Sequence, residues 1–337
     1  MGSLEDKIKA KAIEAGYESC GIIEASLFEE FLVQLNTRST LFPHAGPFYD
    51  RLRRLANPKE SIEWAKSIIV CLRRYDRYKI PEGLERFVGK VFLVDSRLSY
   101  SKEYAGTVEF EQFLDGIGLK AIKNAAPARW SAVKAGLGKF RNNNFVYTKR
   151  GSWNWIDTWV IDKQMEYEIP IDDARFACPD SCNRCIKACP TAALSDSLTM
   201  DGTCCIAHLS CAANLLPSEN LRDKMGTWLY GCDVCQNVCP ANSGTWQENE
   251  KFPEPSRLKD IITLEDLFLM DEETYWAKVQ PRFWYISKDD IWQWKCNALR
   301  AMANMDSPKY EKYFIRALAD HNENVREIAS WAQNKAK

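Results

Sequence analysis

The spacing of the cysteines constrains this chain more than any other feature. Ten of its thirteen cysteines lie between Cys178 and Cys239, within about one fifth of the 337 residues. Short gaps let successive thiolates bind one iron–sulfur cluster, while the cysteine before a closing proline binds the partner cluster. Two such runs are present, CPDSCNRCIKACP with Cys178, Cys182, Cys185 and Cys189, and GCDVCQNVCP with Cys232, Cys235 and Cys239. The sequence therefore predicts two 4Fe–4S clusters.

Two clusters of this kind need eight cysteine ligands, and the two runs supply seven of them. The eighth must come from Cys204, Cys205 or Cys211, which lie between the runs. Cys205 is the first choice and Cys204 the second.

Zinc and disulfides are the alternative interpretations of these cysteines. C-x2-C pairs also occur in zinc sites, but zinc does not require the duplicated C-x3-C-P ending. Disulfides need an oxidising compartment. The N-terminal stretch MGSLEDKIKAKAIEAG is a charged amphipathic helix without the apolar segment of a signal peptide. We therefore expect a cytoplasmic location, where clustered cysteines bind metal.

Composition indicates a globular protein that does not span a membrane. The chain is 46% hydrophobic and 27% charged, without a long apolar stretch. Its formal net charge of -1 gives no overall attraction to nucleic acid, so any such binding would have to be local. Twelve tryptophans and thirteen tyrosines suit the walls of a pocket for a large planar ligand, although most of them are expected in the core.

Three domains are expected along the chain. In residues 1–170, a helix near 4–15 and apolar strands at 18–25 and 67–72 indicate an α/β (α+β) domain. Residues 171–250 hold the cysteine runs. Residues 251–337 are expected to be helical, with paired helices that resemble a HEAT-type repeat, because apolar residues recur at three- and four-residue spacing. Ten Lys and Arg against seven Asp and Glu in residues 281–337 permit RNA binding without arguing for it.

Two stretches of the first domain carry groups suited to a ligand. Gly136 and Gly138 lack the third glycine of a dinucleotide-binding fingerprint, so we expect them to let the backbone approach another group closely. A basic stretch can grip phosphates or carboxylates, although a solvated strand end is the more ordinary interpretation. It consists of Arg73, Arg74, Arg77 and Lys79.

The order of these segments resembles the epoxyqueuosine reductase family, which comprises cobalamin-dependent iron–sulfur enzymes related to reductive dehalogenases. The resemblance covers nearly the whole chain, and it identifies the chain as a divergent member of that family. The motifs that carry it are AGLG at 135–138, the asparagine of NNNF at Asn144, GSW at 151–153, CNRCIKACPTAAL, the Cys205 region, YGCDVCQNVCPAN, and NALRAMAN with DHNENVREIASWA in the tail.

The resemblance implies a corrinoid-binding α/β domain, an inserted bacterial-ferredoxin-like domain with two 4Fe–4S clusters, and a helical C-terminal domain that grips tRNA in the parent enzyme. It assigns one cluster to Cys178, Cys182, Cys185 and Cys239, and the other to Cys189, Cys205, Cys232 and Cys235. It assigns corrinoid contacts to Ala135, Gly136, Leu137, Gly138, Asn144, Phe145, Gly151, Ser152 and Trp153.

The histidines agree with an open lower face of a bound cobalamin. Some corrinoid proteins supply the lower cobalt ligand from a D-x-H-x-x-G motif, and none of His44, His208 and His321 lies in that frame. An open face suits a cofactor that must be reduced to a very low potential.

The chain departs from the family pattern beside the expected pocket. The family carries an aspartate in a V-D-S/T-x-P stretch, thought to be the proton donor to the substrate carbon, and alignment on Pro127 places Asn124 there. An amide cannot deliver a proton as an acid. Tyr104 is one candidate replacement, and Lys123, Arg129 or a water molecule are others. The catalytic candidates in the chain are therefore Tyr104, Asn124 and Arg129.

The leading hypothesis is a cobalamin-dependent iron–sulfur reductase. Electrons from a ferredoxin or flavodoxin would pass through both clusters to cobalt and then to a substrate. The helical tail favours a modified tRNA base as substrate, the missing aspartate favours a small molecule such as an organohalide, and the sequence leans slightly towards the small molecule. The alternatives are an iron–sulfur electron-transfer protein that has lost the corrinoid, and a corrinoid carrier without substrate chemistry of its own.

Overall fold

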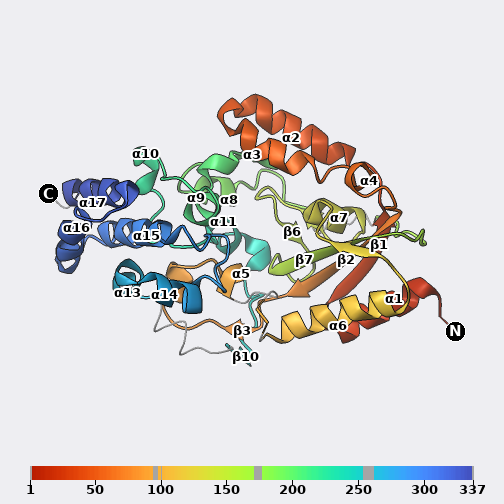
Figure 1. The fold of residues 1–337 in the computed structure, drawn as a ribbon. Coiled ribbons are helices and arrows are strands. Elements are labelled where there is room, and N and C mark those ends of the chain that lie inside the picture. Colours follow the sequence, from red (N-terminus) through yellow and green to blue (C-terminus); the bar gives the residue numbers. More distant parts are fainter. Residues whose placement is uncertain (1, 94–97, 100, 171–176, 253–261, 336–337) are drawn as a thin grey trace.

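The computed structural model describes residues 2–93, 98–99, 101–170, 177–252 and 262–335. Its largest sheet has four strands, in the order β1 (Ser19–Glu24), β2 (Ser67–Arg74), β7 (Asn154–Ile161) and β4 (Ala121–Lys123) (Figure 1). Each neighbouring pair of strands in this sheet is antiparallel. Of the two labels expected for the first domain, α+β therefore describes the sheet, since α/β folds have mainly parallel sheets.

Strand β2 lies inside the first domain and is buried along its whole length. Its side chains alternate between the two faces of the sheet. Ile69 and Cys71 face a core shared with α1 (Leu4–Glu14) and α6 (Lys102–Gly116). Ile68 and Val70 face a second core. That core is shared with helices on the opposite side of the sheet in Figure 1, namely α2 (Glu29–Leu41), α3 (Gly46–Arg53) and α7 (Ala128–Lys134).

Because helices cover both faces of this sheet, groups that meet a ligand must come from strand ends and turns. One such segment follows α7, where the glycine turn leads into the hairpin of β5 (Lys139–Phe140) and β6 (Val146–Tyr147). The turn of this hairpin, residues 141–145, holds the asparagines of the NNNF motif. The other short elements of this domain are α4 (Pro58–Ser61), β3 (Tyr78–Lys79) and α5 (Lys90–Leu93).

The cysteine region is built from short helices and turns. The helices that carry the two cysteine runs, α8 (Arg184–Ala188) and α11 (Val234–Asn237), pack against each other. Strand β10 (Glu250–Lys251) then pairs with β3 and returns the chain to the first domain. The expected boundary at 170 and 171 adjoins residues 171–176, which lie outside the described residues. The remaining elements are β8 (Leu194–Asp196), β9 (Thr199–Met200), α9 (Ile206–Cys211) and α10 (Glu219–Arg222).

The C-terminal part is helical, as expected from its apolar periodicity. The long helix α15 (Ile291–Asn304) packs against α13 (Leu264–Leu269) and α17 (Glu323–Lys335), and α16 (Glu311–Ala317) packs against α17. A short helix, α14 (Glu272–Thr274), follows α13. The core of these helices continues into earlier segments, because Val88 and Leu229 belong to the same apolar cluster. The tail is therefore packed on the rest of the molecule and does not form a core of its own.

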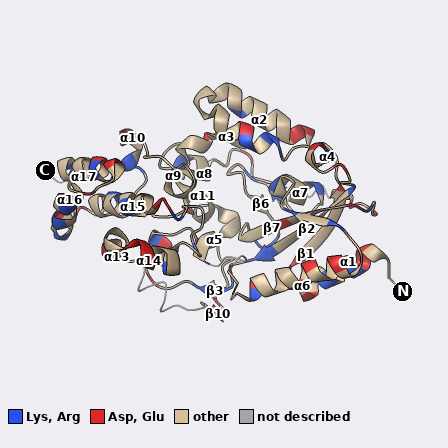
Figure 2. Cartoon of the chain, viewed as in Figure 1, with Lys and Arg blue, Asp and Glu red and all other residues tan. Residues whose placement is uncertain are grey.

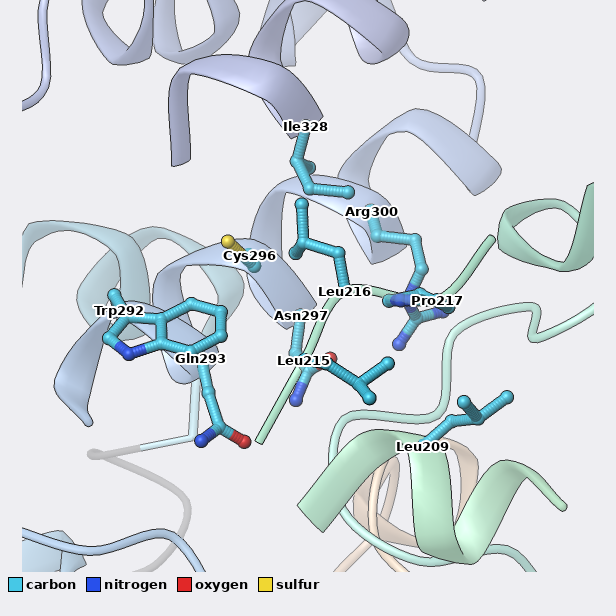
Figure 3. Close-up of a pocket in the computed structure, with 10 residues that line it drawn as sticks. All are labelled: Leu209, Leu215, Leu216, Pro217, Trp292, Gln293, Cys296, Asn297, Arg300 and Ile328. Carbon is cyan, nitrogen blue, oxygen red and sulfur yellow. The ribbon is translucent and has the colours of Figure 1, made fainter. Parts of the chain in front are cut away.

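Polar side chains of α15 fix the tail to the cysteine region. The buried Arg300 donates to the carbonyls of Gly226 and Trp228. Asn297 donates to the carbonyls of Ser210 and Leu229, at 2.8 and 3.0 Å. Figure 3 shows Arg300 and Asn297 pointing from α15 towards the segment 215–217. The cavity between α15 and the segment 215–217 measures only about 10 Å³, so this interface is nearly close-packed.

Among the described helices, none combines the length and the apolarity that a membrane crossing requires. The outer helix α1 carries acidic and basic residues, whereas α6 has one lysine, at its first residue, followed by acidic residues (Figure 2).

Candidate functional site

The first group of cysteines comes from both runs. Burial raises the pKa of the Cys185 thiol, and the nearby charges of Cys178 and Cys239 raise it further. The Asn142 side chain donates to the carbonyl of Cys182 at 2.8 Å, while its backbone N–H donates to Cys178 Sγ at 3.4 Å. Three thiols of the first expected ligand set thus influence one another, and Asn142 links the fourth to them.

The second group also combines residues from both runs with one from between them. Burial raises the pKa of Cys235 well above its usual value, and the charges of Cys232, Cys205 and Cys189 add to that rise. Such mutual repulsion means that the four thiolates need positive charge among them, which iron supplies. The donor set therefore fits two four-cysteine clusters.

The three candidates for the eighth ligand have different surroundings. Cys204 donates its thiol proton to Asp201 Oδ2 at 3.2 Å, and Cys211 donates to the carbonyl of Ala207 at 2.8 Å. Burial raises the pKa of Cys205, although the backbone N–H groups of Ala207 and His208 oppose that rise. Cys205 faces two backbone donors and Cys211 faces one, that of Gly231, and such donors also stabilise a metal-bound thiolate.

The asparagines after β5 connect both cysteine groups to the first domain. Asn142 contacts the first group at Cys178 and Cys182. Asn143, which is buried, donates to the carbonyl of Cys235 at 3.0 Å and to the hydroxyl of Tyr147 at 2.9 Å. The turn therefore touches the backbone of both cysteine runs.

The third asparagine of the turn contacts two arginines. Asn144 has a positive φ of 65°, its side-chain oxygen accepts from Arg38, and its carbonyl accepts from Arg129 at 3.0 Å. Its Nδ2 is buried and has no hydrogen-bond partner among the described residues. An unpaired buried donor is costly, and an acceptor supplied by a ligand removes that cost.

Arg129 lies near the second cysteine group. Its side chain is solvent-exposed, yet desolvation by the surrounding protein lowers its pKa, against the nearby charges of Cys235 and Cys205. Its guanidinium lies 4.4 Å from the centre of the Phe145 ring. Arg129, Asn144 and Phe145 are thus adjacent to one another near the second cysteine group, and they offer a cation, an amide and an aromatic ring to a ligand.

The glycine turn is explained in part by packing within the chain. Gly136 has a positive φ of 68°, which glycine adopts without strain. A Cβ atom on Gly138 would lie 2.6 Å from the Tyr147 carbonyl oxygen, and one on Gly151 would lie 2.5 Å from Asn242 Oδ1. The close approach expected for Gly138 is therefore an approach to strand β6. Ala135 is buried against Gly21 of β1, and Leu137 is half-buried.

The GSW segment faces the cysteine region. Ser152 donates its backbone N–H to Asn242 Oδ1 and its hydroxyl to Gln236 Oε1, both at 2.9 Å. The buried Trp153 donates its indole N–H to Thr245 Oγ1 at 3.1 Å. The side chains of Ser152 and Trp153 thus join the first domain to the second cysteine run, and their expected corrinoid contacts stay a prediction.

The three catalytic candidates come from separate elements. Asn124 ends β4 with a positive φ of 57°, is exposed, and is held by a hydrogen bond from its N–H to the Thr158 carbonyl at 2.7 Å. Tyr104 lies in the first turn of α6 and is 37% exposed. Arg129 belongs to α7. Among the described contacts, none joins any two of these three residues.

The two arginines at the end of β2 serve the fold. Arg73 is buried, with its guanidinium 3.9 Å from the centre of the Tyr17 ring, and it donates to the Ala15 carbonyl at 3.0 Å. Arg74 is buried and pairs with Asp76. Neither a phosphate grip nor a solvated strand end describes these two arginines, because both are enclosed and partnered. The strand pattern had no signal for this, since the partners lie in distant segments.

The sequence did not single out Asn142, Asn143 or Tyr147 as site residues. Burial raises the pKa of Tyr147, and a hydrogen bond to Cys239 raises it further. The signal that was present is the run of three amides directly after a hairpin strand, since consecutive turn residues point in different directions and can meet different partners.

Comparisons with known proteins agree with this arrangement. Residues 178–242 match the family model described as a 4Fe-4S double cluster binding domain. An epoxyqueuosine reductase of Leadbetterella byssophila is 31% identical over 259 residues, which cover 72% of this chain and 81% of that protein. The epoxyqueuosine reductase of Bacillus subtilis is 27% identical over 353 residues, covering 98% of this chain and 87% of that protein.

Solved structures share the fold over the full length. A structure of the Bacillus subtilis epoxyqueuosine reductase, with its catalytic loop swung out of the active site, has a TM-score of 0.82 at 23% identity. A structure of epoxyqueuosine reductase with an epoxyqueuosine-modified tRNA-Tyr stem loop has a TM-score of 0.80 at 23% identity. Each alignment covers 99% of this chain and 90% of the other chain.

Proposed function

The chain belongs to the epoxyqueuosine reductase family, and from this premise we propose that it is a cobalamin-dependent reductase acting on a modified tRNA base. It is an oxidoreductase with a 4Fe–4S double cluster domain. The observation that carries the proposal is the asparagine turn, in which Asn142 and Asn143 bind the two cysteine runs and the Asn144 carbonyl accepts from Arg129. An electron path and groups suited to a ligand thus meet at one turn.

The proposed ligands divide the cysteines into two sets. Cys178, Cys182, Cys185 and Cys239 hold the first cluster, and Cys189, Cys205, Cys232 and Cys235 hold the second. The mutual charge effects within each set support this division. A low-potential ferredoxin or flavodoxin in the cytoplasm is the proposed electron donor.

The turn supports a corrinoid through the unpaired Asn144 Nδ2, the Phe145 ring and the Arg129 guanidinium. The backbone of residues 136–138 would complete the cradle, with residues 151–153 behind it. When bound, the clusters supply single electrons, and the corrinoid supplies a cobalt centre that acts on the substrate carbon. Asn144 donates to an acceptor on the cofactor, and Arg129 keeps a positive charge beside the second cysteine set.

The proposed substrate is a modified base in a tRNA stem loop. The relative solved with such a stem loop has the same fold over 99% of this chain, including the helical tail. This favours the tRNA base over the small molecule towards which the sequence leaned. One observation supports a small-molecule substrate as the second candidate. Asn124 has no acidic proton, so the step that protonates the product must use a different group.

An assay with the modified stem loop tests the proposal. The chain, loaded anaerobically with iron, sulfide and cobalamin, is given a low-potential reductant and an epoxyqueuosine-modified tRNA-Tyr stem loop. We expect loss of one oxygen atom from the base, as measured by mass spectrometry of the nucleosides. Cobalamin binding without that mass change, together with turnover of an aryl halide, would favour the second candidate.

A further inference from the structure

We propose that His44, Asp201 and Cys204 form a binding site for one Zn²⁺ ion, separate from the two cluster sites. The three ligand atoms, His44 Nε2, Asp201 Oδ2 and Cys204 Sγ, all lie within 4.8 Å of one another. This combination of imidazole, carboxylate and thiolate is one that zinc accepts in proteins. The proposal does not depend on the substrate or on the corrinoid.

Two distant segments bring these ligands together. His44 belongs to the turn between α2 and α3, and Asp201 and Cys204 belong to the turn that precedes Cys205. Tyr49, fully buried in α3, accepts from the backbone N–H of Gly202 at 3.1 Å and donates to the carbonyl of Met200. These contacts hold the two segments in register, so the site is formed by the fold before any ion binds.

The two oxygens of Asp201 have separate tasks. Oδ1 accepts from the backbone N–H and the hydroxyl of Thr203, at 2.9 and 2.7 Å. Oδ2 accepts from His44 Nε2 at 2.6 Å and from Cys204 Sγ at 3.2 Å. A carboxylate that is oriented through one oxygen, with the other facing a histidine and a thiol, is an arrangement that supports a metal ligand. The ion would take the place of the protons that now lie between Oδ2 and its two partners.

The distances need only a small adjustment. In a tetrahedral zinc site, neighbouring N, O and S ligand atoms stand about 3.3 to 3.6 Å apart. The Asp201 and Cys204 atoms are already near that separation, and the His44 and Asp201 atoms must separate by less than 1 Å, while the His44 and Cys204 atoms lie within 4.8 Å. The His44 side chain is 61% exposed, so its ring is free to move and the fourth position of the ion is open to water.

The site is distinct from the second cluster although Cys204 and Cys205 are adjacent. Cys204 Sγ points to Asp201, whereas Cys205 faces the N–H groups of Ala207 and His208. An ion held by the three ligands would tie the turn after α2 to the segment that leads into Cys205. The ion would thereby restrain the motion of the first domain relative to the second cysteine group.

Zinc content tests the proposal on the full chain with both clusters loaded anaerobically. After equilibration with micromolar Zn²⁺ and gel filtration, we expect one bound zinc per chain. X-ray absorption at the zinc edge should give one sulfur and three nitrogen or oxygen ligands. His44→Ala and Cys204→Ala should each weaken zinc binding about 100-fold or more, with the iron content unchanged.

Matched controls are available within the chain. His321 lies 3.4 Å from Asp320, a pair that belongs to no group of three metal-ligating side chains among the described residues, and Cys211 is a buried thiol outside the site. His321→Ala and Cys211→Ala should therefore retain the zinc. Four sulfur ligands around zinc, unchanged zinc in His44→Ala, or loss of iron in Cys204→Ala would each overturn the proposal. The first two place the zinc outside this site, and the third makes Cys204 a cluster ligand.

Discussion

The cysteine region and the segment from Asn124 to Arg129 differ in how closely they match the family motifs. In the cysteine region, both runs and their C-x3-C-P endings are present, and the thiols gather in two groups. In the other segment, the amide Asn124 stands where the resemblance places an acid, and no described contact joins the three catalytic candidates. The difference indicates that electron delivery is under tighter chemical constraint than proton delivery. A cluster accepts only a narrow set of ligands, whereas several groups or water can supply a proton.

The largest expected effect is in the cysteine region. Cys205→Ala should lower the iron content from about eight to about four atoms per chain and abolish reductase activity, because the second cluster loses a ligand. Iron analysis and the visible spectrum of anaerobic protein measure this. Cys211→Ala, which removes a thiol that donates to the Ala207 carbonyl, should keep all the iron. Equal iron loss in both variants would remove the distinction between a ligand and a packed thiol.

The next effect is in the amide-bearing segment. Asn124→Asp should raise turnover of an epoxyqueuosine-modified stem loop by about 100-fold, because an acid then occupies the family's proton-donor position. Aspartate tolerates the positive φ of 57° as asparagine does, so the fold should be unaffected. Since only the protonated acid donates, the added rate should fall as the pH rises through its pKa. An unchanged rate at every pH would mean that another group already supplies the proton.

The helical tail is fixed to the cysteine region by side chains of α15, so its stability depends on that region. Arg300→Met should lower the free energy of unfolding by about 3 kcal/mol, since the Gly226 and Trp228 carbonyls lose a charged donor. Arg316→Met on the exposed face of α16 is the matched control and should cost little. Denaturant unfolding of both variants measures the difference. A similar loss in both would show that the Arg300 contacts add nothing specific.

The smallest expected effect distinguishes two neighbouring asparagines. Asn143→Ala should lower the free energy of unfolding by about 2 kcal/mol, because Asn143 is buried and donates hydrogen bonds to both Cys235 and Tyr147. Asn142→Ala should cost about 1 kcal/mol, since its side chain is half-buried and its backbone N–H to Cys178 Sγ is kept. Thermal unfolding of the cluster-loaded variants compares them. The reverse order would contradict the role given to the buried amide.

Local signals made part of this molecule predictable from sequence. The cysteine runs predict a double-cluster domain because ligand spacing is set by cluster chemistry, and the family model over residues 178–242 confirms that domain. The apolar periodicity of the tail predicts helix, and α15 and α17 are found there. In the sequence, the polar residues of the NALRAMAN motif indicate the family resemblance and nothing about their contacts. Their function as anchors depends on carbonyls at 210–229, which no local pattern reveals.

Contacts between distant segments account for what the sequence did not predict. Arg73 looked like a ligand-binding or solvated residue because its partners, Tyr17 and Ala15, are encoded far away. The two other asparagines of the NNNF motif could not be assigned to the two cysteine runs for the same reason. The sequence motif excludes His44 as a lower cobalt ligand but does not reveal its contact with Asp201, which lies 157 residues later in the chain.

The metal content of the purified chain tests the central claim most directly. The protein is isolated anaerobically, incubated with cobalamin and freed of excess cofactor, in parallel with an Asn144→Ala variant. We predict about eight cluster irons and one cobalt per wild-type chain. The Asn144→Ala variant should bind less cobalt and keep the same iron content. Eight irons with no bound cobalt in the wild-type chain would contradict this prediction and would leave an electron carrier without substrate chemistry of its own.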